Sequence, residues 1–193
     1  MLRRIYDWAL RVAGHRHAMA GLALVAFLES SVFPIPPDIV LLPMVLAAPR
    51  RAWAIAAVAT AASVVGGALG YLIGAGLFEA VGRPVLEFYG QMDRFADFRE
   101  IYQEWGFWFV AGAGFTPFPY KVITIASGAL ALDPMVFMLA SIGSRGARFF
   151  LESALLWWFG PPIRRFVEAH LPVLTWLFFA LLLGGFLAAR YVF

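Results

Sequence analysis

The chain has 193 residues, of which 62% are hydrophobic and only 14% are charged. Soluble domains carry about 25% charged residues, and a chain of this size has too high a surface-to-volume ratio to hide so much apolar surface. The composition therefore predicts an all-α integral membrane protein and argues against a nucleic-acid-binding protein or a soluble enzyme. The formal net charge of +3 fits basic loops beside membrane spans.

The first 17 residues alternate apolar and basic side chains, which predicts a helix lying in the membrane interface. A signal peptide is the alternative, because an apolar run follows the basic residues. However, no small-residue cleavage site precedes Glu29.

Residues 18–49 are apolar but are broken by the segment ESSVFPIPPD at 29–38. The 11 uncharged residues after the break, 39–49, span roughly 16 Å as a helix, about half of a hydrocarbon core. Irregular backbone at membrane depth is tolerated only where protein or trapped water covers it. We therefore expect a re-entrant helical hairpin over 18–49. The prolines expected at its tip are Pro34, Pro36 and Pro37.

A membrane-spanning helix is predicted over residues 52–82, because 27 consecutive residues from Ala52 to Phe78 carry no charge. The linker that follows, 83–104, places acidic residues at helical spacing and most of its apolar residues on the other side. This pattern predicts an amphipathic helix on the membrane surface. The acidic residues are Asp93, Asp97, Glu100 and Glu104.

A second re-entrant hairpin is predicted over residues 105–132, where the segment TPFPYK breaks another apolar region. The tip prolines are Pro117 and Pro119, and the arm after the break again has 11 uncharged residues. A long helix over 134–159 and a C-terminal transmembrane helix within 161–193 complete the expected fold.

The two halves resemble each other, which predicts an inverted repeat. Pro34-x-Pro36 aligns with Pro117-x-Pro119, and this alignment sets Asp38 opposite Lys121. Because one crossing separates the hairpins, they are expected to enter from opposite faces, as in many transporters. Eight arginines fall on the N-terminal side, which predicts that this side is cytoplasmic. They are Arg3, Arg4, Arg11, Arg16, Arg50, Arg51, Arg164 and Arg165.

Charged residues inside the apolar regions are functional candidates by default, because burying a charge in a bilayer costs several kcal/mol. We interpret these residues as a substrate or proton site. Arg148 and Glu152 are four residues apart, so a structural ion pair between them is an alternative. Asp38 either caps the helix that begins at Ile39 or pairs with Lys121. The candidates are Glu29, Asp38, Lys121, Arg145, Arg148 and Glu152.

The chemistry at the hairpin tips favours an anion. A helix that restarts after a proline directs free N–H groups toward the break, and Lys121, Arg145 and Arg148 add positive charge. Arginine matches phosphate well, and a lipid phosphate is the natural candidate in a membrane. The alternative is that the three cations only neutralise Glu29, Asp38 and Glu152. Either tip carboxylate could instead bind a proton.

Signals for an enzyme or a metal site are weak. His15, His17 and His170 show no metal-ligand spacing, and Ser127 has no evident histidine base. We therefore expect no enzyme, metal or cofactor.

Several of these motifs resemble the DedA family, also called SNARE-associated or VTT-domain membrane proteins. FLESSVFPIPPD resembles the first-hairpin signature of that family, with Glu29 and Asp38 at its acidic positions. GGALGYLIGAGL resembles its glycine-rich helix, GAGFTPFPYKVITIASGAL its second hairpin, and GSRGARFF the following helix. The short chain and the TPFPYK segment look most like the YqaA-type branch.

The resemblance implies two facing re-entrant hairpins in a bacterial inner membrane and movement of lipids between leaflets. The family commonly has an arginine where this chain has Gly114, and we hypothesise that Arg145 and Arg148 supply the missing charge. We expect a flippase for an anionic lipid, either a polyprenyl phosphate or a phospholipid, and coupling to protons is an option. The alternative is a membrane scaffold that docks partners through its acidic linker. Membrane lipids are the expected partners, nucleic acid is not, and self-association is left open.

Overall fold

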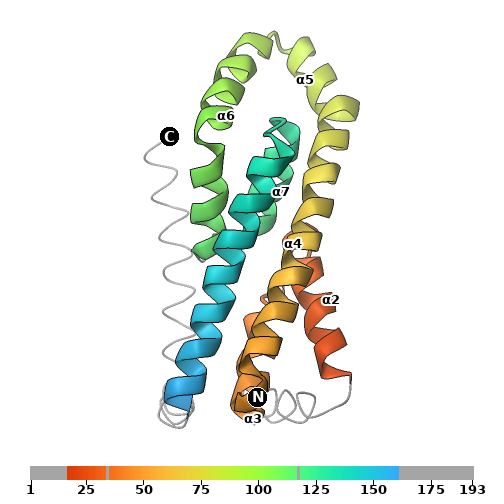
Figure 1. Ribbon diagram of the computed structural model, residues 1–193. Coiled ribbons are helices and arrows are strands. Elements are labelled where there is room, and N and C mark those ends of the chain that lie inside the picture. Colours follow the sequence, from red (N-terminus) through yellow and green to blue (C-terminus); the bar gives the residue numbers. More distant parts are fainter. Residues whose placement is uncertain (1–16, 34, 117, 161–193) are drawn as a thin grey trace, which may run out of the picture. The chain divides into compact units, whose positions relative to one another are not determined.

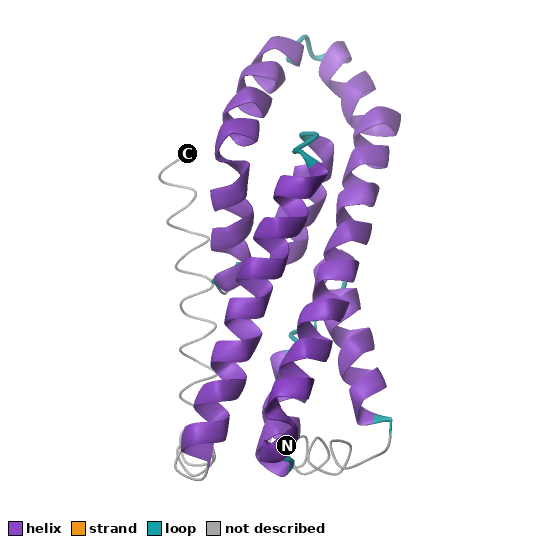
Figure 2. Cartoon of the chain, viewed as in Figure 1, coloured by secondary structure: helices purple, strands orange, loops and turns teal. Residues whose placement is uncertain are grey.

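The computed structural model describes residues 17–160 except Pro34 and Pro117. All regular structure in these ranges is helical, as Figure 2 shows, and no strand occurs in them. The prediction of an all-α fold is confirmed for this part of the chain. The predicted interfacial helix at the N-terminus and the predicted C-terminal span lie outside the described residues. The description below concerns the compact unit that ends at Trp157.

The first helical hairpin consists of α2 (Ala18–Ser31) and α3 (Asp38–Ala47). The last turn of α2 closes with the amides of Val32 and Phe33 both donating to the Leu28 carbonyl. Pro36 and Pro37 have no N–H to continue that helix, and α3 restarts from the Pro37 carbonyl. The predicted proline break is confirmed, and the ten residues of α3 extend about 15 Å.

The next helix includes the predicted range 52–82 and extends beyond it at both ends. A short 3-10 turn, η1 (Pro49–Arg51), leads into α4 (Ala52–Leu77), which continues through a π-turn, η2 (Phe78–Gly82), into α5 (Arg83–Phe88). Within the described residues this 40-residue helix, Pro49–Phe88, alone has the length and apolar composition to cross a membrane. Its length of about 60 Å is twice that of a typical hydrocarbon core.

The predicted surface helix over 83–104 is wrong as a separate element. Its first part is α5, and its second part is the beginning of α6 (Met92–Phe115), a continuous helix. The turn between them uses Gly90 with φ +62°, a conformation that costs glycine little. No proline interrupts 92–115, so the first arm of the second hairpin begins 13 residues earlier than the predicted Trp105.

The second helical hairpin pairs α6 with α7 (Tyr120–Ala129), again across a proline-containing break. A turn then leads into a helix over residues 134–160. Asp133 caps that helix, because its Oδ1 accepts hydrogen bonds from the amides of Met135 and Val136 at 2.8 and 3.0 Å. The order of a hairpin followed by a long helix therefore occurs twice. Figure 1 shows that α2 and α6 run in opposite directions toward their breaks.

Helix α4 packs most extensively against α2 of the first hairpin and α7 of the second. Glycines make these contacts close: a Cβ on Gly66 would collide with the Phe27 carbonyl, and one on Gly74 with the Ile125 carbonyl. A Cβ on Gly128 of α7 would likewise collide with the Tyr71 carbonyl of α4. Small residues at these positions let the backbones approach each other, as they do between membrane helices.

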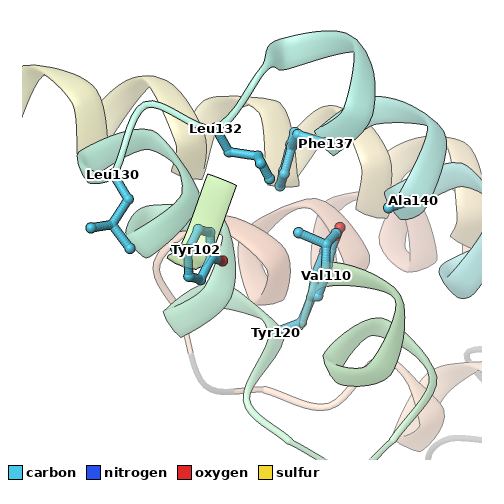
Figure 3. Close-up of a cluster of buried hydrophobic side chains, with 7 residues drawn as sticks. All are labelled: Tyr102, Val110, Tyr120, Leu130, Leu132, Phe137 and Ala140. Carbon is cyan, nitrogen blue, oxygen red and sulfur yellow. The ribbon is translucent and has the colours of Figure 1, made fainter. Parts of the chain in front are cut away.

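A hydrophobic cluster fixes the second hairpin against the helix that follows it (Figure 3). Its members come from α6, α7, the turn after α7 and the start of the 134–160 helix. They are Tyr102, Val110, Tyr120, Leu130, Leu132, Phe137 and Ala140. The two tyrosine hydroxyls of this cluster form hydrogen bonds inside the protein. The Tyr102 hydroxyl lies 2.9 Å from Ser127 Oγ, and the Tyr120 hydroxyl donates to Ser141 Oγ at 2.5 Å.

The outward faces of the helices are strongly apolar. Leu72 and Trp108 are each 66% exposed, and Leu139 is 58% exposed. A soluble monomer rarely exposes large contiguous apolar patches. Further exposed apolar side chains on the long helices are Trp53, Val65, Leu69, Leu77, Phe107, Phe109, Ile142, Phe150, Leu151 and Leu155.

Candidate functional site

Two arginines of the 134–160 helix form ion pairs with two carboxylates of the first hairpin. Arg145 Nη2 lies 2.8 Å from Glu29 Oε2, and Arg148 Nη2 lies 2.6 Å from Asp38 Oδ2. Glu29 is near the end of α2 and Asp38 is the first residue of α3, so the carboxylates flank the proline break. The two pairs therefore attach the first hairpin to the helix that follows the second one.

The Arg145 side chain is almost fully enclosed, with 1% of its surface exposed. Its Nε donates to Ser63 Oγ of α4 at 2.6 Å, and the Ser63 and Ser30 hydroxyls lie 2.6 Å apart. Ser30 donates to Glu29 Oε2 at 3.1 Å. The four side chains form a closed ring of hydrogen bonds, in which each partner supports the geometry of the next.

Aromatic rings cover the Arg145 guanidinium. Its Cζ lies 4.8 Å from the ring centroid of Tyr120 and 4.7 Å from that of Phe149. Such contacts contribute about 2 kcal/mol when the cation is desolvated. The Arg145 Nη1 group has no hydrogen-bond partner among the described residues.

The second pair is more accessible. The Arg148 and Asp38 side chains are 23% and 25% exposed. Arg148 Nη1 also points to the carbonyl of Thr116 at 3.4 Å, just beyond the end of α6. Arg148 thus contacts the proline-rich tip of each hairpin, with Asp38 on one and Thr116 on the other. Solvent or a ligand can reach both members of this pair, whereas in the Arg145 pair the arginine is enclosed and only the Glu29 side chain, 16% exposed, is partly accessible.

Glu152 and Lys121 occupy the borders of this cluster. Glu152, one turn after Arg148, is half-buried and forms no ion pair with a described arginine. Lys121 is half-buried in the first turn of α7, and it forms no ion pair with a described carboxylate. Pro37 is buried, whereas Pro36 and Pro119 are exposed at the tips. Pro34 and Pro117 lie outside the described residues.

Three contacts that the sequence left open as alternatives are not formed. Asp38 does not pair with Lys121, because it forms its ion pair with Arg148 of the 134–160 helix instead. Asp38 also makes no side-chain cap on α3, since Oδ2 is engaged by Arg148 and Oδ1 accepts no bond. Arg148 is not within ion-pair distance of Glu152, although helical spacing permits it.

Ser30, Ser63, Thr116 and Tyr120 contribute to the site but were not predicted. The available signal was Ser63, a hydroxyl in the middle of a long uncharged helix. Tyr120, a polar aromatic residue directly before Lys121, was a second signal. None of the described residues forms a group of three or more histidine or acidic side chains arranged to hold a metal ion.

The fold and the site define a protein, all-helical in its described residues, in which two arginine–carboxylate pairs join a proline-broken helical hairpin to the helix that follows a second such hairpin. The chain is 33% identical over 172 residues to an uncharacterized protein of Haemophilus influenzae, covering 89% of each chain. It is 35% identical over 172 residues to the uncharacterized HI0703 homolog of Histophilus somni, covering 89% of this chain and 90% of the other. The chain belongs to the family of these two proteins. No family model and no solved structure matches it.

Proposed function

We propose that the chain is a DedA-type integral membrane protein that moves an anionic lipid between the leaflets of a bacterial inner membrane. The proposed topology is multi-pass with a cytoplasmic N-terminus. In this topology helix Pro49–Phe88 crosses the bilayer. The 134–160 helix crosses as well, and the pairing of Arg145 and Arg148 with the first hairpin offsets the cost of their charges there. The two hairpins enter the bilayer from opposite faces. The exposed apolar faces of the long helices support this placement, because lipid tails cover such surfaces without cost.

The observation that carries the proposal is the accessible Arg148–Asp38 pair between the hairpin tips. A lipid phosphate matches the guanidinium of Arg148 in charge and geometry, so it can replace the Asp38 carboxylate there. Lys121, which has no ion-pair partner among the described carboxylates, adds a second positive charge on α7. The headgroup passes between the tips while the acyl chains remain against the apolar outer faces.

The Arg145–Glu29 pair, whose arginine is enclosed, has a different role in this proposal. Ser30, Ser63 and two aromatic rings surround it, so it fixes the first hairpin rather than contacting lipid. In this proposal Arg145 is structural and Arg148 binds the headgroup. Neither residue takes part in a catalytic step.

Leaflet exchange in proteoliposomes tests the proposal. Labelled phosphatidylglycerol, phosphatidylethanolamine and a polyprenyl phosphate are compared with wild type and Arg148→Gln. We expect one anionic lipid to exchange, and the variant to lose about tenfold or more of the rate, because a charged hydrogen bond contributes about 1.5–3 kcal/mol. Arg83→Gln is the matched control, since Arg83 forms an exposed pair with Glu79 on the same chain. Exchange of no lipid by folded protein would reject the transporter.

A membrane scaffold is the second candidate. It is favoured by the four acidic residues Asp93, Asp97, Glu100 and Glu104, which are all exposed on α6. A scaffold requires that neutralising these four residues abolishes function in the cell and that Arg148→Gln does not. The lipid transporter requires the opposite pattern.

A further inference from the structure

An aromatic cluster of Trp53, Phe150 and Trp157 lies on the outer surface of the protein. Trp53, near the start of α4, stacks on Phe150 of the 134–160 helix and contacts Trp157 of the same helix, with 6.1 Å between ring centroids in each case. Figure 1 shows the start of α4 and the end of the 134–160 helix at the same end of the bundle. The three residues stay exposed, from 37% for Phe150 to 51% for Trp157. The ring contacts therefore hold together an aromatic surface that is not part of the hydrophobic core.

Two arginines beside the aromatic cluster have no partner for their charge. Arg50 and Arg51 are the last two residues of η1, both are exposed, and neither forms an ion pair with a described carboxylate. Arg50 lies three residues before Trp53, and residues at this spacing share a helix face. No acidic residue occurs in the sequence between Asp38 and Glu79. This part of the surface therefore carries two uncompensated positive charges.

The charged residues next to Phe150 on the 134–160 helix face away from the aromatic cluster. Arg148 and Glu152 each lie two residues from Phe150, which is about 200° around the helix axis. Arg148 accordingly contacts the two hairpin tips, and Glu152 is half-buried. The surface formed by the aromatic cluster and the η1 arginines is therefore different from the Arg148 site.

The chemistry of this surface matches the headgroup region of a bilayer leaflet. Tryptophan is enriched at membrane interfaces, because its ring is apolar while its N–H reaches polar headgroups. An arginine guanidinium pairs with a phosphate group through two parallel hydrogen bonds. Leu151 and Leu155, which are exposed on the same helix, offer apolar surface to acyl chains that a free phosphate lacks. Together these groups fit an anionic phospholipid.

We infer that Arg50, Arg51 and the aromatic cluster form an interfacial binding site for an anionic phospholipid, which places the start of the Pro49–Phe88 helix at one membrane interface. The lipid bound there is an anchor and does not pass between the hairpin tips. The inference rests on the membrane placement proposed above, but it does not require lipid transport.

The distribution of charge along the long helix supports this placement. A hydrocarbon core of about 30 Å takes about 20 helical residues, so a helix that enters it at Arg51 leaves it near Leu72. Ser63, which belongs to the enclosed hydrogen-bond ring, then lies near the middle of the bilayer. The exposed ion pair between Arg83 and Glu79 lies beyond the hydrocarbon. The uncharged stretch of the helix therefore coincides with the apolar part of the membrane.

Native mass spectrometry of the purified full chain in detergent tests the site, with phosphatidylglycerol as the probe and phosphatidylcholine for comparison. Wild type should retain phosphatidylglycerol preferentially. The double variant Arg50→Gln with Arg51→Gln should bind it about tenfold more weakly or worse, since each arginine near an anionic lipid contributes about fivefold. Arg83→Gln with Arg94→Gln is the matched control, because it removes two positive charges at other exposed positions. Equal affinity in wild type and the first variant, or an equal loss in the control, overturns the inference.

Other occupants of this surface give different results in the same spectra. Displacement of the lipid by inorganic phosphate would assign the site to free anions. A dimer that is lost in Trp53→Ala would make the aromatic cluster a contact between two copies of the chain. Either result overturns the lipid site. Arg148→Gln should keep the lipid that depends on Arg50 and Arg51. Retention of that lipid by a protein that exchanges no lipid would reject the proposed function and support the anchor.

The depth of the helix is tested with single cysteines in proteoliposomes, because the chain contains no cysteine of its own. Glu87→Cys should react with a membrane-impermeant maleimide when it faces the outside medium. Val65→Cys should not react from either side, although Val65 is 58% exposed on the protein surface, because lipid covers it. Labelling of Val65→Cys in folded protein overturns the placement of the helix.

Discussion

Arg145 and Glu29 lie 116 residues apart in the sequence and meet at 2.8 Å in the structure. The contact joins the helix after the second hairpin to the first hairpin, and Ser63 of α4 completes it. Three separate parts of the chain thus depend on one guanidinium group.

Replacing Arg145 by Ala should destabilise the protein by about 3–5 kcal/mol, because it leaves Glu29 charged and unpaired in an enclosed site. Thermal or denaturant unfolding in detergent measures the loss. Arg83→Ala, at an exposed ion pair, should cost about 1 kcal/mol or less. The double change Arg145→Met with Glu29→Leu should recover much of the stability. A double variant no more stable than Arg145→Ala would contradict the argument from unpaired charge.

Gly74→Ala should destabilise the contact between α4 and α7 by about 1–3 kcal/mol, because its Cβ would collide with the Ile125 carbonyl. Gly76→Ala is the matched control two residues away on the same helix, where a Cβ meets nothing within 4 Å. Alanine favours helix over glycine, so this control should be neutral or stabilising by up to about 1 kcal/mol. Equal melting temperatures for the two variants would count against the close packing.

Tyr120→Phe should cost about 1 kcal/mol, because it removes the hydroxyl that donates to Ser141 but keeps the ring over Arg145. Tyr120→Leu should cost more, since it also removes the cation–π contact. Denaturant titration of both variants separates the two contributions. If Tyr120→Phe were as harmful as Tyr120→Leu, the ring would contribute nothing to holding Arg145.

Asp133→Ala should destabilise the start of the 134–160 helix by about 1 kcal/mol, because the amides of Met135 and Val136 lose their acceptor. Asp133→Asn should retain most of the stability, since asparagine caps helices nearly as well. Hydrogen exchange at the two amides provides the measurement. Unchanged protection in Asp133→Ala would show that the side chain does not cap the helix.

Local signals in the sequence were sufficient to predict where the helices break. Proline removes a backbone donor whatever the tertiary context, so the breaks before α3 and α7 could be placed from residue identity alone. The predicted boundary at Trp105 is wrong because a change from polar to apolar composition does not by itself end a helix. The α6 backbone continues through it, since nothing there stops a helix.

Which residues belong to the site was easier to predict than which of them contact each other. Glu29, Asp38, Arg145 and Arg148 were all predicted from their position in apolar regions, and the structure brings them together. Their partners depend on how the 134–160 helix rotates against the first hairpin, which the spacing of residues along one helix does not determine. The repeat suggested Asp38 and Lys121 as equivalents, but equivalent positions in two repeats need not touch each other. The membrane topology, the DedA resemblance and the lipid substrate stay predictions.

The long sequence separation of the Arg145–Glu29 contact has a consequence for synthesis of the chain. At about 5–20 residues per second, the ribosome needs roughly 6–23 s to make the 116 residues that separate the two. During that interval the nascent first hairpin holds an acidic side chain whose cation does not yet exist. The Arg145–Glu29 contact can therefore form only after the 134–160 helix has been synthesised. Until then the first hairpin cannot adopt its final packing.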